Sequence, residues 1–255
     1  MTAGLLFFLM PFEKLFPRVP FHFSIARLVV VTAIAVCTFA IAWGFNQTLY
    51  MPLVRALLSI QIFSVSQLPV PTWALLAGCI LLIDLMLYVF HVLSHKITPL
   101  WKLHAIHHAD EHVDVATGIL RHPFETVASL IFVLFFSVIL GVPVVAVILY
   151  AGIGTIHNMF AHANISLPEK LDMVLRQLIV TPDMHRTHHS IDPKEGNSNF
   201  GQMFPFWDRA FGTYVDHPKT GEEQLIMGLS AAEKPRSFSL VGLLLHPFMA
   251  LFSKK

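Results

Sequence analysis

Long apolar stretches alternate with polar segments along this chain. Residues 25–45 and 72–90 are each almost wholly apolar, and about 20 apolar residues in a helix cover the hydrocarbon core of a bilayer. A third stretch, 126–156, is too long for one crossing and is interrupted by Gly141-Val-Pro143. Glycine and proline turn the chain there, which predicts a helical hairpin with arms at 126–140 and 144–157. The pattern predicts an all-α membrane protein with about four transmembrane helices.

The sequence outside these stretches is more polar. Segments 91–125 and 158–237 contain most of the histidines, and we expect them to form one helical cap, so that 1–255 is a single membrane domain. Residues 47–71 are predicted to form a connecting loop along the membrane interface. Arg27 is expected to extend its long side chain to the lipid headgroups. The apolar segment 238–252, interrupted by His246-Pro247, is expected to lie on the membrane surface.

Composition supports a membrane protein and excludes other classes. The chain has 255 residues, of which 55% are hydrophobic and 13% charged, and its mean hydropathy of +0.65 is too high for a soluble domain of this size. The net charge is +1 and the basic residues are scattered, which excludes nucleic acid as a partner. The two cysteines, Cys37 and Cys79, lie in apolar stretches and do not indicate a disulfide framework.

Basic residues predict the orientation in the membrane. Four crossings place the N-terminus, segment 91–125 and everything after 157 on one side. These segments contain most of the lysine and arginine, whereas the opposite loop contains only Arg55; they include Lys14, Arg18, Lys96, Lys102, Arg121, Lys170, Arg176 and Arg186. By the positive-inside rule this side is cytoplasmic, and the cap and both termini are expected there.

Histidines are the most informative polar residues. Ten of the fifteen gather in four clusters at the polar ends of the apolar stretches: His91 and His95; His104, His107 and His108; His157 and His162; and His185, His188 and His189. The second and fourth clusters share the pattern H-x-x-H-H. Helical residues three and four apart lie on one face, so one helix can present three imidazoles to one or two metal ions.

The number of imidazoles predicts the kind of metal site. All-imidazole ligands suit iron, copper, zinc or nickel rather than calcium or magnesium, and about ten exceed the four of a structural zinc site. Two metal ions are therefore predicted. Two alternatives remain open, a membrane transporter of transition metals and a structural zinc protein without catalysis. Transport favours ionisable groups at mid-membrane, whereas these histidines lie at the ends of the predicted spans.

Asp84 is the one charged residue deep within a predicted span. It precedes His91 by seven residues and so shares a helix face with it. A lone carboxylate in a span is costly without a partner. We expect Asp84 to accept a hydrogen bond from a ligand imidazole and orient it; the alternative is a packing role away from the metal.

Residues 84–214 resemble the fatty acid hydroxylase and sterol desaturase superfamily, a group of membrane non-haem di-iron oxygenases, and look most like its bacterial sterol-desaturase-like branch. The resemblance rests on the order H-x-x-x-H, H-x-x-H-H, H-x-x-H-H and on the text between these motifs. That text includes Arg121-His122-Pro123-Phe124-Glu125, His162-Ala-Asn164, Thr181-Pro-Asp-Met-His185-Arg-Thr-His188-His189-Ser190, Asn199-Phe-Gly201 and Trp207-Asp208-Arg-Ala-Phe-Gly-Thr-Tyr214.

The resemblance implies two metal ions, normally iron and with zinc possible after isolation, that activate O2 to hydroxylate or desaturate a membrane lipid such as a sterol or fatty acyl chain. It implies ligand roles for the histidines of the three motifs. In the remaining cluster the family often has two histidines four residues apart, whereas His157 and His162 are five residues apart. Both are nevertheless expected to be metal ligands. Polar residues of the shared text are expected to support the ligands, namely Arg121, His122, Glu125, Asn164, Asn199 and Asp208.

Electrons for such a reaction are expected from a separate protein. The chain shows no G-x-G-x-x-G dinucleotide motif, no C-x-x-C-H haem motif and no ferredoxin-like set of cysteines. The expected donor is a cytochrome b5, a ferredoxin or a flavin reductase. The chain is predicted to be an integral membrane protein, and the resemblance implies a bacterial inner membrane.

Overall fold

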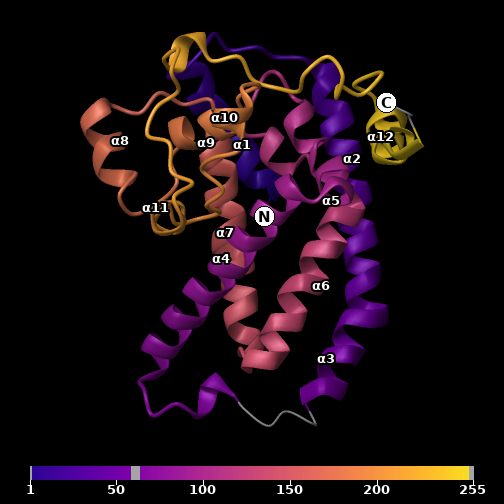
Figure 1. The fold of residues 1–255 in the computed structure, drawn as a ribbon, viewed down its shortest axis with the longest axis vertical. Helices are drawn as coiled ribbons and strands as arrows, with labels where there is room; N and C mark the ends of the chain where they lie inside the picture. The colour runs from indigo at the N-terminus through magenta and orange to yellow at the C-terminus, as the bar shows by residue number, and fades with distance from the viewer. Residues whose placement is uncertain (1, 59–63, 253–255) are drawn as a thin grey trace.

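The protein is an elongated helical molecule with long helices at one end and a cap of short helices and loops at the other (Figure 1). The computed structural model describes residues 2–58 and 64–252. Within these ranges there is no β-strand, only two isolated bridges, Pro17 with Ile165 and Ser190 with Met227. The predicted all-α class is confirmed.

Four helical segments are long and apolar enough to cross a membrane, as the hydropathy pattern predicts. They are α2 (Ile25–Phe45) with its continuation, α4 (Thr72–Lys96), α6 (Pro123–Leu140) and α7 (Val144–His162). Gly141 ends α6 in the left-handed conformation at φ 64°, which glycine adopts without steric cost, and Pro143 precedes α7. The predicted hairpin is therefore confirmed.

Several predicted boundaries are wrong in an informative way. The first span does not end at 45, because a π-helical turn (Asn46–Tyr50) joins α2 to α3 (Met51–Leu58). The loop expected over 47–71 is thus helical in its first part, while residues 59–63 lie outside the described ranges and a 3₁₀ turn follows at Val65–Gln67. The second and fourth spans continue past 90 and 157 to Lys96 and His162. Hydropathy alone stops at the first polar residue, whereas the cap buries the polar ends and lets both helices continue.

The cap consists of short elements from distant parts of the chain. They are α1 (Thr2–Leu15), α5 (Thr98–His104), 3₁₀ turns at His107–Ala109, Thr117–Ile119 and Glu222–Gln224, α8 (Glu169–Leu175), α9 (Pro182–His188), α10 (Pro193–Gly196) and α11 (Phe206–Phe211). The apolar α12 (Leu240–Phe252) lies at its edge and continues through Pro247. The interruption predicted there does not end the helix.

Arg27 does not extend to the headgroups as predicted. Its guanidinium donates to the carboxylates of Asp110 and Asp114, with Nη1 and Nη2 each 2.8 Å from an Asp114 oxygen. Nη2 also donates to the hydroxyl of Thr117. The start of the first span is therefore tied to the segment that follows the first H-x-x-H-H motif.

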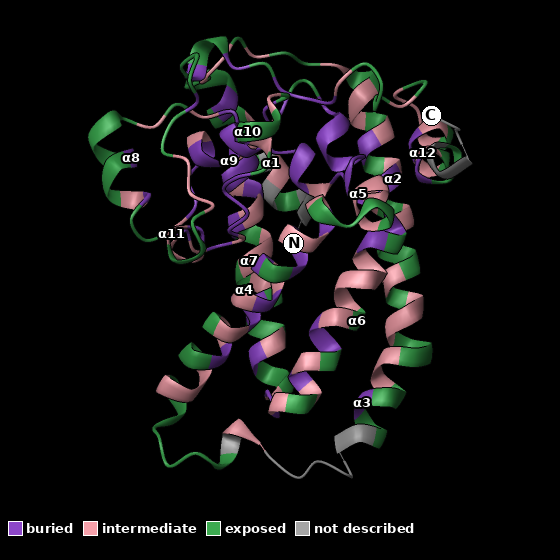
Figure 2. Cartoon of the chain, in the orientation of Figure 1, coloured by how far each residue is buried: buried purple, intermediate pink, exposed green. Residues whose placement is uncertain are grey.

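Burial is inverted relative to a soluble protein. The spans expose large apolar side chains, for example Phe39 at 72% and Ile148 at 65%, whereas the interior beneath the cap contains many buried polar residues. Figure 2 shows this division, with buried residues concentrated where the long helices meet the cap. A membrane accounts for the exposed apolar surface. The buried polar interior requires a partner for its polar atoms.

Candidate metal centre

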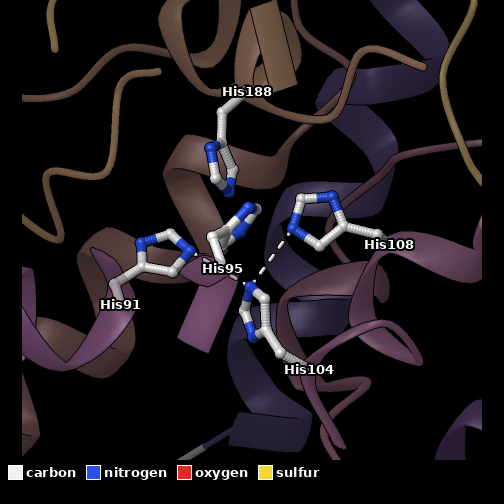
Figure 3. A group of neighbouring side chains, drawn as sticks. All are labelled: His91, His95, His104, His108 and His188. Atoms are coloured by element: carbon white, nitrogen blue, oxygen red, sulfur yellow. Dashed lines mark hydrogen bonds between the residues drawn. The ribbon is translucent and has the colours of Figure 1, made fainter. Parts of the chain in front are cut away.

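Five imidazoles from four elements converge beneath the cap (Figure 3). His91 and His95 come from α4, His104 from the end of α5, His108 from the following 3₁₀ turn and His188 from α9. One nitrogen of each lies within 4.8 Å of the corresponding nitrogen of every other. The Nε2 atom of His104 is 3.1 Å from that of His91 and 3.2 Å from that of His108.

A second group of four imidazoles meets the same 4.8 Å criterion. His162 comes from the end of α7, His107 from the 3₁₀ turn, His185 from α9 and His189 from the residue that caps α9. The Nε2 atom of His162 is 3.0 Å from that of His107 and 2.9 Å from that of His185. All four residues are buried.

Each H-x-x-H-H motif contributes to both groups. In the first motif His104 and His108 belong to the five-histidine group and His107 to the four-histidine group; in the second, His188 belongs to the former and His185 with His189 to the latter. The rings of His108 and His189 stack at 4.4 Å between centroids, so the groups are adjacent. The expectation that a single helix carries all three histidines of the first motif is wrong, because α5 ends at His104 and the chain continues as a 3₁₀ turn.

Outward-facing ring nitrogens are held by oxygen acceptors. Five Nδ1 atoms lie within hydrogen-bond distance of a carbonyl or carboxylate: His91 with the Phe200 carbonyl (2.8 Å), His104 with the Glu125 carboxylate (2.8 Å), His107 with the Leu120 carbonyl (3.1 Å), His162 with the Asn158 carbonyl (2.6 Å) and His188 with the Ser198 carbonyl (2.7 Å). An oxygen acceptor requires a proton on Nδ1, which leaves the Nε2 lone pair directed inward.

The inward nitrogens fit metal ions. In the pair His107–His162 the carbonyl acceptors at both Nδ1 atoms leave both Nε2 atoms with lone pairs and no proton, yet these lie 3.0 Å apart. Two acceptors at that distance repel unless a cation lies between them. Adjacent ligands on one octahedral ion with bonds of about 2.1 Å are about 3 Å apart. Nε2 of His95, His188 and His189 is also buried without a hydrogen-bond partner.

Burial keeps the cap histidines neutral, as metal binding requires. Desolvation lowers the pKa of His188 to about 4, opposed by the hydrogen bond to Ser198. It lowers the pKa of His104, His107 and His185 well below the usual value, and neighbouring imidazoles add to the effect. A protonated, unbound cluster is therefore disfavoured at neutral pH.

The loop at 198–204 supplies two of the acceptors and is itself fixed by buried polar groups. The Asp208 carboxylate accepts from the backbone N–H of Phe200 (2.7 Å) and of Gly201 (2.8 Å). Burial raises the pKa of Asp208 to about 6, and these hydrogen bonds oppose the rise. Asn199 adopts a left-handed conformation (φ 49°), and its side chain bonds the backbone of Met184 and Val215. Asn199 and Asp208 thus hold the loop whose carbonyl groups meet His91 and His188.

Asp84 serves the same loop, and the predicted hydrogen bond from a ligand imidazole is wrong. Its carboxylate accepts from the Tyr150 hydroxyl (2.5 Å), the Trp207 indole N–H (2.9 Å) and the backbone N–H groups of Met203 (3.0 Å) and Phe204 (3.4 Å). These four donors supply the hydrogen-bond partners that a lone carboxylate in a span requires. Helical periodicity placed Asp84 on the correct face but could not show that this loop fills the space.

His157 lies outside both groups. Its Nε2 atom lies 3.0 Å from the Val180 carbonyl, which directs that nitrogen to the cap backbone just before α9. His162, five residues later at the end of α7, is the histidine of this cluster that joins a group. The structure therefore assembles nine of the ten predicted ligands.

The remaining predicted support residues hold the surrounding elements. Arg121 donates to the Asn158 side chain (3.2 Å) and lies 3.8 Å from the Glu125 carboxylate. His122 caps α6 by accepting from the Phe124 N–H and lies 3.2 Å from the Leu244 carbonyl of α12. The Asn164 side chain exchanges two hydrogen bonds with the Val19 backbone, and the Asn164 backbone N–H donates to Glu13.

Sequence reasoning missed the acceptors that belong to the backbone. Ser198, Phe200, Leu120 and Asn158 orient imidazoles through carbonyl groups, which any residue possesses. It also missed Glu13, a buried carboxylate of α1 that accepts from the backbone N–H groups of Val115 and Asn164. A charged residue within an apolar N-terminal helix was the available signal.

Comparisons with known proteins find similarity to lipid hydroxylases and monooxygenases. A family model described as fatty acid hydroxylase matches residues 76–213, which include all nine grouped histidines. The chain is 28% identical over 134 residues to ornithine lipid hydroxylase OlsE of Rhizobium tropici, covering 52% of this chain and 39% of that protein. It is 26% identical over 149 residues to the alkylglycerol monooxygenase of Danio rerio, covering 58% and 31%.

A third relative is the cholesterol 25-hydroxylase-like protein of Danio rerio, 25% identical over 139 residues and covered to 54% in both chains. The match thus spans between 31% and 54% of the length of these curated relatives. No solved structure matches the chain.

Proposed function

Because this chain belongs to the fatty acid hydroxylase family, we propose that it is a membrane oxidoreductase that uses O2 to hydroxylate or desaturate a lipid at two iron ions. One observation carries the proposal. Two adjacent groups of five and four imidazoles have inward nitrogens about 3 Å apart, and in the His107–His162 pair no proton is available between them. Each group suits one ion.

The chain's own residues would bind the two metal ions and orient the imidazole rings that hold them. His91, His95, His104, His108 and His188 would hold one ion, and His107, His162, His185 and His189 the other. The bound iron supplies the oxygen activation that side chains cannot. The carbonyl and carboxylate acceptors fix ring orientation and raise imidazole basicity, which supports metal affinity. The cap excludes bulk water, since eight of the nine histidines are buried.

The reaction defines further partners. Hydroxylation places one oxygen atom of O2 in a C–H bond and reduces the other to water, which consumes two electrons and two protons. Desaturation removes two hydrogens and reduces both oxygen atoms with the same electron input. We propose that a separate cytochrome b5, ferredoxin or flavin reductase delivers the electrons.

Membrane orientation follows the basic residues. We place the cap and both termini on the cytoplasmic side, because the segments that form the cap contain most of the lysine and arginine. An electron donor would then reach the centre from the cytoplasm, and the bacterial inner membrane is the proposed location. The lipid would approach through the apolar spans beneath the centre.

The substrate is proposed as a membrane lipid, such as a sterol, a fatty acyl lipid or a related molecule. The relatives are named for an ornithine lipid, an alkylglycerol and cholesterol, which share an apolar body and a polar end. Four spans that expose apolar side chains provide the matching surroundings.

Metal transport and a purely structural zinc site receive less support. The one carboxylate deep in a span, Asp84, is occupied by four donors of the protein and does not form a stepping site for a cation. Nine converging imidazoles exceed the four ligands of structural zinc.

The decisive experiment combines metal analysis with lipid analysis. We expect close to two transition-metal ions per folded chain, and lipids that incorporate ¹⁸O from ¹⁸O2, or gain a double bond, only in cells expressing the protein. His107→Ala and His188→Ala, one from each group, should abolish the lipid change and lower the metal content. His217→Ala, an exposed cap histidine, should change neither. Two metals without any lipid change would refute the oxygenase proposal, and one metal or none would refute the dinuclear centre.

A further inference from the structure

Helix α8 buries Asp172 and its C-cap residue Arg176 and exposes apolar side chains, while Glu169 and Lys170 are exposed at its first turn. Asp172 and Arg176, one turn apart, are buried at 6% and 3% exposure, and Arg176 Nε donates to the Asp172 carboxylate at 2.7 Å. Arg176 also donates to Asp216. A helix on a water-exposed surface has the opposite arrangement, with its apolar stripe inward. The outer face of α8 is therefore not suited to water.

The outward residues form one apolar face with the neighbouring helix α11. We call this the α8–α11 apolar face; its exposed residues are Leu171 (45%), Met173 (51%), Val174 (62%), Leu178 (64%) and Phe211 (59%). The two helices are joined by Arg209, which donates from α11 to the Arg176 carbonyl at 2.7 Å. Figure 2 shows the outer side of α8 as exposed.

This face adjoins the membrane-spanning part of the molecule. Phe211 stacks on Tyr88 of the spanning helix α4, with ring centroids 5.5 Å apart. The Tyr88 hydroxyl lies 2.8 Å from the Thr213 hydroxyl, and Trp207 of α11 donates to Asp84 of α4. Because α11 rests on a span, the α8–α11 apolar face continues the apolar outer surface of that span.

The opposite flank of the molecule carries a matching apolar element. Helix α12 has 13 residues, about 20 Å at 1.5 Å per residue, which is too short to cross the bilayer. It exposes Val241 (64%) and Leu245 (49%). In Figure 1, α8 and α12 lie on opposite sides at a similar height along the long axis, within the half of the molecule that holds the cap. Two short helices with exposed apolar residues at one level are the arrangement that a bilayer surface there would accommodate.

We propose that the α8–α11 apolar face is immersed in the interfacial layer of the bilayer that the spans cross. Lys170, exposed at the edge of α8, would extend its amine to the lipid phosphates, as basic residues beside interfacial helices do. Since α8 is followed closely by α9, this contact would hold His185 and His188 close to the depth of the headgroups. The proposal depends on the membrane location alone and not on the reaction.

The test measures what surrounds α8 in a bilayer. Spin labels are attached to Val174→Cys and Leu178→Cys in a Cys37→Ser, Cys79→Ala background of the full chain, reconstituted in phosphatidylcholine vesicles. Collisions with O2, which concentrates in lipid, are compared with collisions with a water-soluble nickel complex. The matched control is Glu223→Cys, on an exposed turn of the cap. We expect a higher ratio of O2 to nickel collisions at 174 and 178 than at 223.

Each other outcome overturns the proposal. A ratio at 174 and 178 equal to that at 223 would place α8 in water. Low collision rates with both reagents would show that protein covers the face, either a second copy of this chain or another partner. Metal content and thermal midpoint equal to those of the background protein establish that each labelled variant is folded, and the second labelled site serves if one variant is not.

Discussion

The carboxylate of Asp84 is expected to hold the loop at 200–204 in place, and its replacement by leucine tests this. Leucine has a similar volume but no acceptor. It would leave three N–H donors without a partner, the buried one of Met203 and the part-buried ones of Phe204 and Trp207. The Tyr150 hydroxyl would lose its acceptor as well.

The magnitude follows from the number of unsatisfied donors. Each buried N–H left unpaired costs about 1–3 kcal/mol, so Asp84→Leu should lower the free energy of unfolding by about 5 kcal/mol in total. Asp84→Asn should cost only about 1–3 kcal/mol, because its amide oxygen still accepts from Trp207 and Phe204 and its NH2 donates to Tyr150, so that the Met203 N–H alone loses its acceptor. The graded response distinguishes acceptor loss from loss of charge.

The assay is denaturant unfolding in detergent, followed by circular dichroism, for Asp84→Leu, Trp207→Phe and the double variant. Removing the Trp207 N–H removes one of the orphaned donors, so the cost of Asp84→Leu should fall by about 1–3 kcal/mol in the Trp207→Phe background. Metal should also be lost first from the five-histidine group, because Phe200 in the same loop is the acceptor for His91. Additive costs, or leucine and asparagine variants of equal stability, would refute this account.

Four further outcomes are expected. Glu125→Gln should weaken metal binding about 10 to 100-fold, because the carboxylate that polarises His104 is neutralised; isothermal titration of the metal-free protein measures it, and unchanged affinity would contradict it. Burial raises the pKa of Glu13 from 4.5 to about 7, so the folded state holds this proton more tightly and wild-type stability should fall as pH rises from about 4.5 through 7, by about 3 kcal/mol in all. Glu13→Gln should remove this component, seen as thermal midpoints that differ less between pH 5 and pH 8. Gly201→Ala should destabilise the loop, because a Cβ there would lie 2.7 Å from a backbone oxygen, and a thermal midpoint equal to wild type would exclude the clash. Chelation of the metals should lower the thermal midpoint, since binding to the folded state alone stabilises it, and re-addition of iron should restore it.

The four spans were predictable because a bilayer imposes one simple requirement, about 20 apolar residues for each crossing. The hairpin was predictable for a local reason, since Gly141 supplies the left-handed turn after α6. The ends of α4 and α7 were not predictable from hydropathy, because the polar residues that follow 90 and 157 become helical only when the cap buries them.

The sequence by itself determined that imidazoles would meet, since two H-x-x-H-H motifs and H-x-x-x-H place them at one end of the spans. Tertiary structure alone decided how they are shared. His107 and His108, adjacent in the 3₁₀ turn that follows α5, belong to different groups, and the path of α7 brings in His162 and leaves His157 on a backbone carbonyl. It also decided the role of Asp84, because the donors that surround its carboxylate are distant in sequence: Tyr150 is 66 positions away and Trp207 is 123 positions away. Spacing fixes neighbours within one helix turn, whereas a partner from another segment exists only after the chain has packed.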